Sequence, residues 1–277
     1  MNDRIKTIAL RILGQRGSSF IRSALDSVRF FCPHDPLVLV YQMGKVGSQS
    51  VNYALLEIGF FPVVHFHYLK DLKREKKHHY IWVAYALALE WPIKVITLVR
   101  DPVARNVSSF AHDFSSYFGS NMQDHSLQKL GNKFWVWDRH FDGINWFDKE
   151  FKNVLGVDIY DCPFDKEAGF SIYRSRDSKI KYNQGLTQKN FEILIMKIEL
   201  RNEIREDIIK EFLNITEFSQ KYYNVASDRS YKGNYQEFVQ WVKFPQSYLN
   251  EQYNSKFTQH FYTKREIANF ERRWLLG

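Results

Sequence analysis

The chain has 277 residues, of which 25% are charged and 44% hydrophobic, proportions that are usual for a globular protein with a full core. This composition excludes a collagen-like or disordered chain, and the two cysteines exclude a scaffold built on disulfides. The formal net charge of +8 favours an anionic partner, such as a nucleotide, an acidic glycan, a lipid surface or nucleic acid, without choosing among them.

The first 36 residues form an N-terminal extension that we expect to be helical. Ile5, Ile8 and Ile12 alternate there with basic residues, as in a basic amphipathic helix. Such a helix can lie on a membrane surface, but a surface helix packed on the domain is the simpler interpretation. No run of about 18 apolar residues and no secretory signal are present. We therefore expect a single domain over residues 1–277 in the cytoplasm, or at the inner face of the membrane.

The stretch from residue 37 to residue 51 predicts a strand, a glycine turn and a helix. Leu37 to Tyr41 is an apolar run of strand length, Gly44 and Gly47 interrupt it, and the apolar residues that follow have helical spacing. Such a turn presents backbone N–H groups and the positive end of a helix dipole, which together bind anions. The lysine precedes the last glycine, whereas in the ATP-binding loop it follows that glycine. The loop alone does not separate an anion site from a plain strand-to-helix turn.

The next stretches predict two more strands. Residues 61–69 alternate so that His65 and His67 share one face. This pair is either a set of metal ligands, although no third ligand lies near it in the sequence, or a pair of structural histidines. The charge run over residues 70–79 is typical of a solvated helix face. Residues 94–99 form a buried strand followed by Arg100-Asp101-Pro102 and, from Pro102, a helix. Arg100 and Ser108 can then face one anion.

These two phosphate-binding patterns carry a resemblance to a family. The sequence K-V-G-S-Q-S after the first strand, with R-D-P-x-x-R-x-x-S after a later one, resembles the sulfotransferases that use 3′-phosphoadenosine 5′-phosphosulfate (PAPS) as donor. The resemblance implies an α/β fold, a parallel sheet flanked by helices in the P-loop-like sulfotransferase arrangement. It also implies donor-binding residues in both loops: Gly44, Lys45, Val46, Gly47, Ser48, Gln49, Ser50, Arg100, Arg105 and Ser108.

The same resemblance implies how the reaction proceeds. Lys45 would neutralise the charge that grows on the bridging oxygen, and no metal is required. The H-F-H-Y-L stretch at residues 65–69 is similar to one in the glycosaminoglycan 2-O-sulfotransferases, where the second histidine is the base, although it is two residues shorter here. The base is then His67, with His65 beside the acceptor. Glu90 is a reserve base, because other branches use a carboxylate.

The second half of the chain offers candidates for the acceptor side. Trp135 and Trp137 lie among charged residues in a stretch that is either an amphipathic core helix, the interpretation we prefer, or a wall for a sugar. Residues 191–197 predict a strand and residues 204–215 a helix. Lys232 in a polar loop would reach the 3′-phosphate of the donor. Residues 257–274 predict one closing helix, and its F-Y-T-K-R-E-I-A-N-F resembles bacterial proteins described as capsular polysaccharide synthesis enzymes.

The sequence thus predicts a PAPS-dependent carbohydrate sulfotransferase acting in surface or capsular polysaccharide synthesis, with a carbohydrate acceptor and no nucleic acid as partner. Two alternatives stay open. One is an ATP-dependent kinase that uses the same loop, with Asp101 as the only obvious metal ligand. The other is a non-catalytic glycan-binding relative that keeps the fold without the chemistry.

Overall fold

The computed structural model describes residues 36–60, 62–68, 92–138, 145–182, 185–220 and 232–276, with isolated positions at 74, 79 and 83. Side chains are described in these ranges except at 138, 175–182, 185–191 and 232. The expected N-terminal helix, the charge run apart from positions 74 and 79, Glu90 and the side chain of Lys232 therefore lie outside the described residues.

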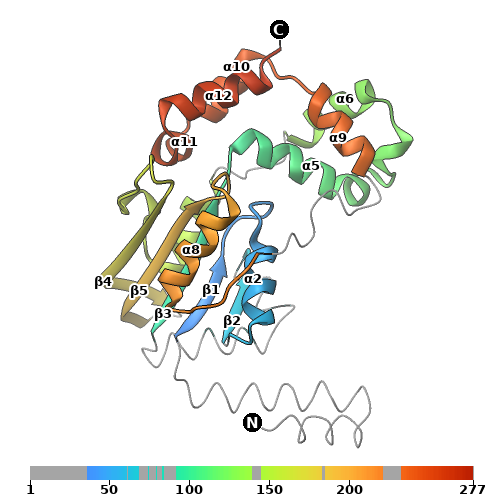
Figure 1. Ribbon diagram of the computed structural model, residues 1–277. Helices are drawn as coiled ribbons and strands as arrows, with labels where there is room; N and C mark the ends of the chain where they lie inside the picture. Colours follow the sequence, from blue (N-terminus) through green and yellow to red (C-terminus); the bar gives the residue numbers. More distant parts are fainter. Residues whose placement is uncertain are drawn as a thin grey trace, which may run out of the picture.

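A five-stranded sheet is the centre of the fold (Figure 1). Its strand order is β2-β1-β3-β5-β4, and all neighbours are parallel except β4 and β5, which form an antiparallel hairpin. The sheet confirms the expected α/β class, with one strand that the sequence did not predict. The strands are β1 (Leu37–Tyr41), β2 (Val63–Phe66), β3 (Ile93–Val99), β4 (Phe170–Tyr182) and β5 (Gly185–Lys197).

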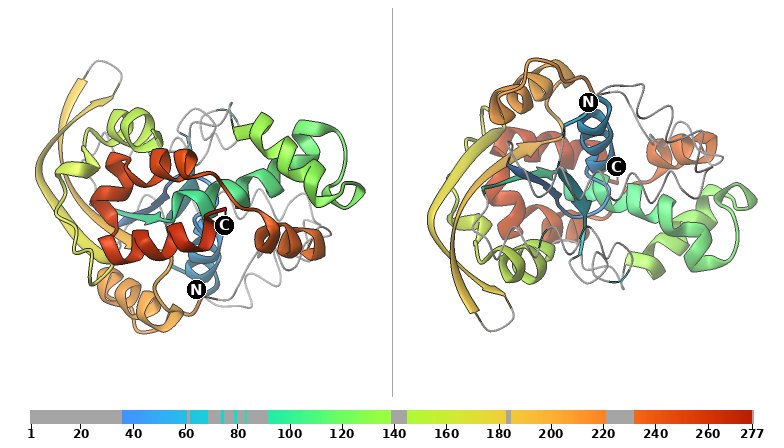
Figure 2. Two further views of the ribbon diagram at one scale, coloured as in Figure 1. Left: turned by 90° about the horizontal axis from the view of Figure 1, so that it is seen from above. Right: turned by 90° about the horizontal axis from the view of Figure 1, so that it is seen from below.

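Helices lie on both faces of the sheet and beyond its carboxyl edge (Figures 1 and 2). Helices α2 and α8 cover one face and α7 the other, while α5, α10, α11 and α12 lie beyond the edge at which β1, β3 and β5 end. The α-helices are α2 (Ser48–Glu57), α5 (Pro102–Phe118), α6 (Leu127–Asp138), α7 (Lys152–Leu155), α8 (Asn202–Leu213), α9 (Lys232–Trp241), α10 (Gln246–Tyr253), α11 (Lys256–Phe261) and α12 (Lys264–Trp274). The short helical turns are η1 (Met122–Asp124), η2 (Phe147–Phe151, a π-helix) and η3 (Ile159–Asp161).

The core follows from the apolar runs of the sequence. All five residues of β1 are buried, and so are six of the seven in β3, as expected for strands covered on both faces. Phe110 and Phe114 of α5 are buried, and Phe110 packs against Phe134 of α6 and Phe238 of α9. Pro102 begins α5 and Gly59, at a φ of 73°, follows the end of α2, both as the sequence indicates.

The direction of winding reverses between β1 and β3, the position at which open α/β sheets form a ligand crevice. The connection from β1 leads through α2 to β2 on one side, and the chain then returns to β3 on the other side of β1. Where the direction of winding reverses in this way, the loops at the carboxyl ends of the two strands separate, and open α/β sheets bind their ligands there. The two sequence patterns on which the family resemblance rests follow these two strands.

The C-terminal segment is two helices rather than the single closing helix that the sequence predicted. Helix α11 ends at Phe261, and Thr263 begins α12 with a capping box, in which its hydroxyl accepts from the Glu266 N–H and the Glu266 carboxylate accepts from the Thr263 N–H. This reciprocal pair satisfies N–H groups that a continuous helix would bond internally, so it favours a new helix start.

Candidate functional site

The loop between β1 and α2 has the geometry of an anion site. Lys45 and Gly47 adopt left-handed backbone conformations, with φ of 68° and 84°, and Gly47 is the N-cap of α2. A side chain on Gly47 would place its Cβ 2.3 Å from Cδ1 of Ile198, so both backbone and packing require glycine there. Around Gly44, in contrast, the space is open. The first turn of α2 carries no acidic residue, which leaves the positive end of its dipole uncompensated.

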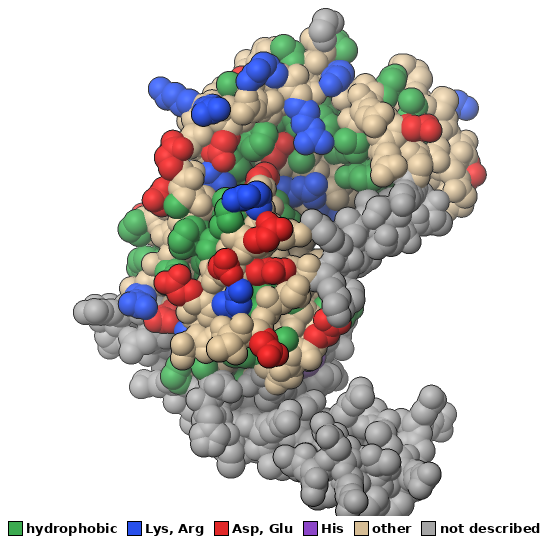
Figure 3. Space-filling model, viewed as in Figure 1, with side chains coloured by type: hydrophobic (Ala, Val, Ile, Leu, Met, Phe, Trp, Pro, Cys, Tyr) green, Lys and Arg blue, Asp and Glu red, His purple; other side chains and the backbone are tan. Residues whose placement is uncertain are grey.

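Two arginines of the second pattern reach across to this loop. Nη1 of Arg100 donates to the carbonyl oxygen of Lys45 at 2.8 Å, and Nε of Arg105 donates to that of Gly44 at 3.3 Å. Both bonds occupy carbonyl oxygens of the loop, which holds the loop in a fixed conformation beside two guanidinium groups. The structure therefore brings together the two patterns that lie about 55 residues apart in the sequence. Figure 3 shows basic side chains gathered where the surface is hollowed beyond the carboxyl edge of the sheet.

Arg105 is an unusual group, a guanidinium with only 4% of its surface exposed. Its Nη1 donates to Oδ1 of Asn106, whose amide donates in turn to the Tyr248 hydroxyl, so these acceptors and the loop carbonyl are all uncharged. Burial lowers the pKa of Arg105 to about 10, because a desolvated cation loses the stabilisation of water. An anion bound beside it would restore that stabilisation. Ser108 is half-buried and lies three residues further along α5, on the same side of the helix as Arg105.

Asp101 anchors the turn that carries Arg100. Its carboxylate caps α5 by accepting from the Val103 N–H at 3.0 Å, and it also accepts from the Tyr253 hydroxyl at 3.1 Å and from Nε1 of Trp274 at 3.0 Å. Three donors on a carboxylate that is 2% exposed leave little room for a metal ion. Within the described ranges, no group of three or more His, Cys, Asp or Glu side chains is placed to hold one.

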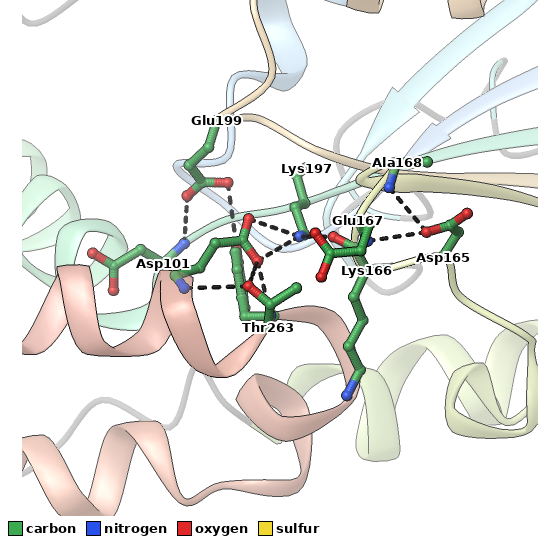
Figure 4. Close-up of polar contacts among 10 residues, drawn as sticks. Asp101, Asp165, Lys166, Glu167, Ala168, Lys197, Glu199 and Thr263 are labelled. Carbon is green, nitrogen blue, oxygen red and sulfur yellow. Dashed lines mark hydrogen bonds and ion pairs between the residues drawn. The ribbon is translucent and has the colours of Figure 1, made fainter.

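Glu199 holds the same turn from the end of β5 (Figure 4). Its Oε1 accepts from the Asp101 N–H at 2.7 Å and its Oε2 from the Tyr262 hydroxyl at 3.2 Å. Although part of the residue is open to solvent, protein closely surrounds the carboxylate, and this burial raises its pKa to about 7. Lys197, two residues earlier, is buried and pairs with Glu266 at 2.8 Å, so β5 is tied to α12 as well.

The two histidines lie together at the carboxyl end of β2. His65 pairs with Val40 in the parallel register, and the rings of His65 and His67 are 4.9 Å apart, so the expected common face is confirmed. Nδ1 of His67 is 2.7 Å from the carbonyl oxygen of Gln42, the residue that follows β1. Tyr68 is near enough to Arg105 for its hydroxyl to influence the charge of that guanidinium. The H-F-H-Y stretch therefore adjoins the anion loop.

The two tryptophans proposed for the acceptor lie elsewhere. Trp137 is 4% exposed and packs on Phe110 at 5.9 Å, in the core of the domain, as the core interpretation of this helix expects. Trp135 is half-buried and meets the site only indirectly, since its ring contacts Tyr248 at 5.3 Å, the residue bonded to Asn106. Sequence reasoning gave no role to Gln42 or Glu199, and it considered Trp146 only as part of the same stretch, a core helix or a wall for a sugar. Gln42 and Glu199 are polar residues just past the carboxyl end of a strand, which is the signal that could have found them; Trp146, at the start of η2, carries no such signal.

A comparison with protein families finds one match in this chain. Residues 140–263 match the family described as "Putative capsular polysaccharide synthesis protein", which suggests a role in polysaccharide biosynthesis. The matched segment contains β4, β5 and the helices from α7 to α11, and it begins after both donor patterns. No curated protein and no solved structure matches the chain. None of the described helices is both long and apolar enough to span a membrane.

Proposed function

We propose that this chain is a sulfotransferase that moves a sulfuryl group from PAPS to a hydroxyl of a carbohydrate, in the synthesis of a surface or capsular polysaccharide. The observation that carries the proposal is the pair of bonds from Arg100 and Arg105 to the carbonyl oxygens of the 44–50 loop. These bonds assemble a glycine turn, a helix N-terminus and two guanidinium groups at one point, which suits a ligand with two separate phosphate groups. We propose a polysaccharide as the acceptor because the matched family is described by capsular polysaccharide synthesis.

The residues present fit such a donor. The open space at Gly44 admits an anionic group close to the backbone, and α2, whose N-terminus carries a positive partial charge, begins four residues later. Arg100, Arg105 and Ser108 are then available for the second phosphate, at the 3′ position. Lys45, in a strained left-handed conformation within the loop, would neutralise the charge that develops on the bridging oxygen. Fixed cations and dipoles of this kind lower the barrier because they act where charge appears.

In the reaction, the oxygen of the acceptor hydroxyl forms a bond to sulfur while the bond from sulfur to the bridging oxygen breaks. The electron pair of that bond stays on the leaving adenosine 3′,5′-bisphosphate, and the proton of the hydroxyl passes to His67. The ATP-dependent alternative needs a metal ligand at Asp101, whose carboxylate already has three donors. The geometry at Asp101 thus favours PAPS, whose reaction requires no metal ion, over ATP with Mg²⁺.

The test is the thermal stability of the purified chain with adenosine 3′,5′-bisphosphate, compared with ADP and with ATP and Mg²⁺. A ligand at 100 times its Kd adds about 2.7 kcal/mol to the free energy of unfolding, which corresponds to a rise in Tm of roughly 5 °C. We expect this shift with the bisphosphate, and its loss in Arg100→Ala. Arg174→Gln removes a positive charge from an exposed site on β4 and is the matched control. A shift with ATP and Mg²⁺ alone would favour the kinase, and no shift at all the non-catalytic relative.

A further inference from the structure

Gln42 lies at the point where β1 and β3 separate. The ladder between these strands ends at Val40 and Ile96, and two residues further on the Leu98 N–H donates to Oε1 of the Gln42 side chain at 2.8 Å. A side chain thus takes the place of the backbone acceptor that continued pairing would provide. Gln42 is fully buried, so its position is set by the sheet and not by solvent. The backbone carbonyl of Gln42 is thereby held at the edge of the crevice, two residues before the anion loop begins at Gly44.

The carbonyl of Gln42 fixes the protonation of the His67 ring. A carbonyl oxygen only accepts hydrogen bonds, so the contact of 2.7 Å requires the proton of the neutral ring to be on Nδ1. The lone pair of the ring is then on Nε2, at the far side from Gln42. Both histidines are half-buried, but Nε2 of His65 is enclosed by protein. Of the two histidines, His67 is the one that can present a basic nitrogen to a substrate.

Trp146 holds the backbone of the same histidine. Its Nε1 donates to the carbonyl oxygen of His67 at 2.9 Å, just past the end of β2, which is an edge strand of the sheet. The indole is 3% exposed and meets the Tyr41 ring edge-on with 5.0 Å between centroids, so it is itself fixed by the core. Trp146 belongs to the segment matched by the polysaccharide family, whereas His67 does not. This bond therefore connects the matched segment to the donor half of the chain.

We propose that the Gln42 carbonyl and the Trp146 indole are positioning groups that hold His67 as the base, with Nε2 as the atom that accepts the proton. The inference rests on the proposed function and deepens it, because it selects His67 over His65. When Nε2 takes the hydroxyl proton, the ring becomes an imidazolium, and its Nδ1–H bond to Gln42 is retained and strengthened by the charge. Ring orientation therefore does not change during the transfer, and such preorganisation is what positioning groups supply.

The first test reads the tautomer of His67 without any assay of activity. The full chain labelled with ¹⁵N in its histidines gives long-range ¹H–¹⁵N correlations that distinguish the two nitrogens, and His67→Gln identifies the signals. At a pH where the ring is neutral, we expect the proton of His67 on Nδ1. A proton on Nε2, or a mixture of the two tautomers, would overturn the proposal. His67→Gln serves only to assign the signals, and the tautomer itself is read in the wild-type chain.

The second test removes the indole N–H with Trp146→Phe, which keeps an aromatic ring in the core. We expect kcat for sulfuryl transfer to fall about 10- to 100-fold while KM for PAPS is unchanged, since donor binding does not involve the indole. Trp241→Phe, on exposed α9, is the control and should change neither. An unchanged kcat and tautomer in Trp146→Phe would refute the role of the indole. Absence of bisphosphate binding in the wild type would refute the proposed function instead. The tautomer of His67 would still show whether the Gln42 carbonyl positions its ring.

Discussion

Replacing Gly47 by alanine tests whether the loop conformation is fixed by packing against β5. The left-handed backbone costs an L-residue roughly 1–2 kcal/mol, and a Cβ at 2.3 Å from Cδ1 of Ile198 forces that side chain to move, at a cost of about 1–3 kcal/mol. Alanine also lowers the conformational entropy of the unfolded chain, and this offsets about 0.4–1 kcal/mol of the loss. The expected net loss in the free energy of unfolding is therefore about 2–4 kcal/mol.

Urea unfolding followed by circular dichroism measures this loss, provided that the m-value is unchanged. Gly44→Ala is the control, because no atom lies within 4 Å of its new Cβ and its φ is not positive. It should be as stable as the wild type or more stable by up to about 1 kcal/mol, whereas its methyl group should weaken bisphosphate binding by filling the open space. In an Ile198→Ala background, Gly47→Ala should cost about 1–3 kcal/mol less than in the wild type, which is the steric part of the cost. Equal stability of the two glycine variants would refute this reasoning.

Three further predictions concern the carboxylates and the buried lysine around the site. Tyr253→Phe should lose about 1.5–3 kcal/mol in urea unfolding, because it removes one donor from the buried carboxylate of Asp101; a loss under about 0.5 kcal/mol would contradict that anchor. Glu199 has a pKa of about 7 in the folded protein against an ordinary value of 4.5, so the folded state binds more protons and stability should fall as pH rises from about 5 to 7. Calorimetry of Glu199→Gln between pH 5 and pH 8 should show that this part of the decline is gone, and an identical pH profile in the two proteins would count against it. Lys197→Met should lose about 1–3 kcal/mol, and adding Glu266→Gln should recover part of it; simple additivity in urea unfolding would argue against the pair.

The sequence predicted the parts of the site that depend on neighbouring residues. The apolar run at β1, the glycines of the loop and the proline at the start of α5 each act within a few positions, so strand, turn and helix could be placed from the pattern alone. Alternation in β2 placed His65 and His67 on one face for the same reason. The sequence did not predict strand β4, because this strand is stabilised by pairing with β5. It predicted one helix where there are two at the C-terminal end, because hydrophobic periodicity does not reveal the capping box at Thr263.

What only the tertiary structure decided is how distant segments meet. His67 and Trp146 are 79 positions apart and Asp101 and Trp274 are 173 apart, and each pair is joined by one directional hydrogen bond at the carboxyl edge of the sheet. Local propensity carries no information about such a bond, because it forms only after strand order and helix packing have brought the two groups within about 3 Å. The sequence by itself placed the two turns after their strands; the order of the strands brought these turns together at one edge of the sheet.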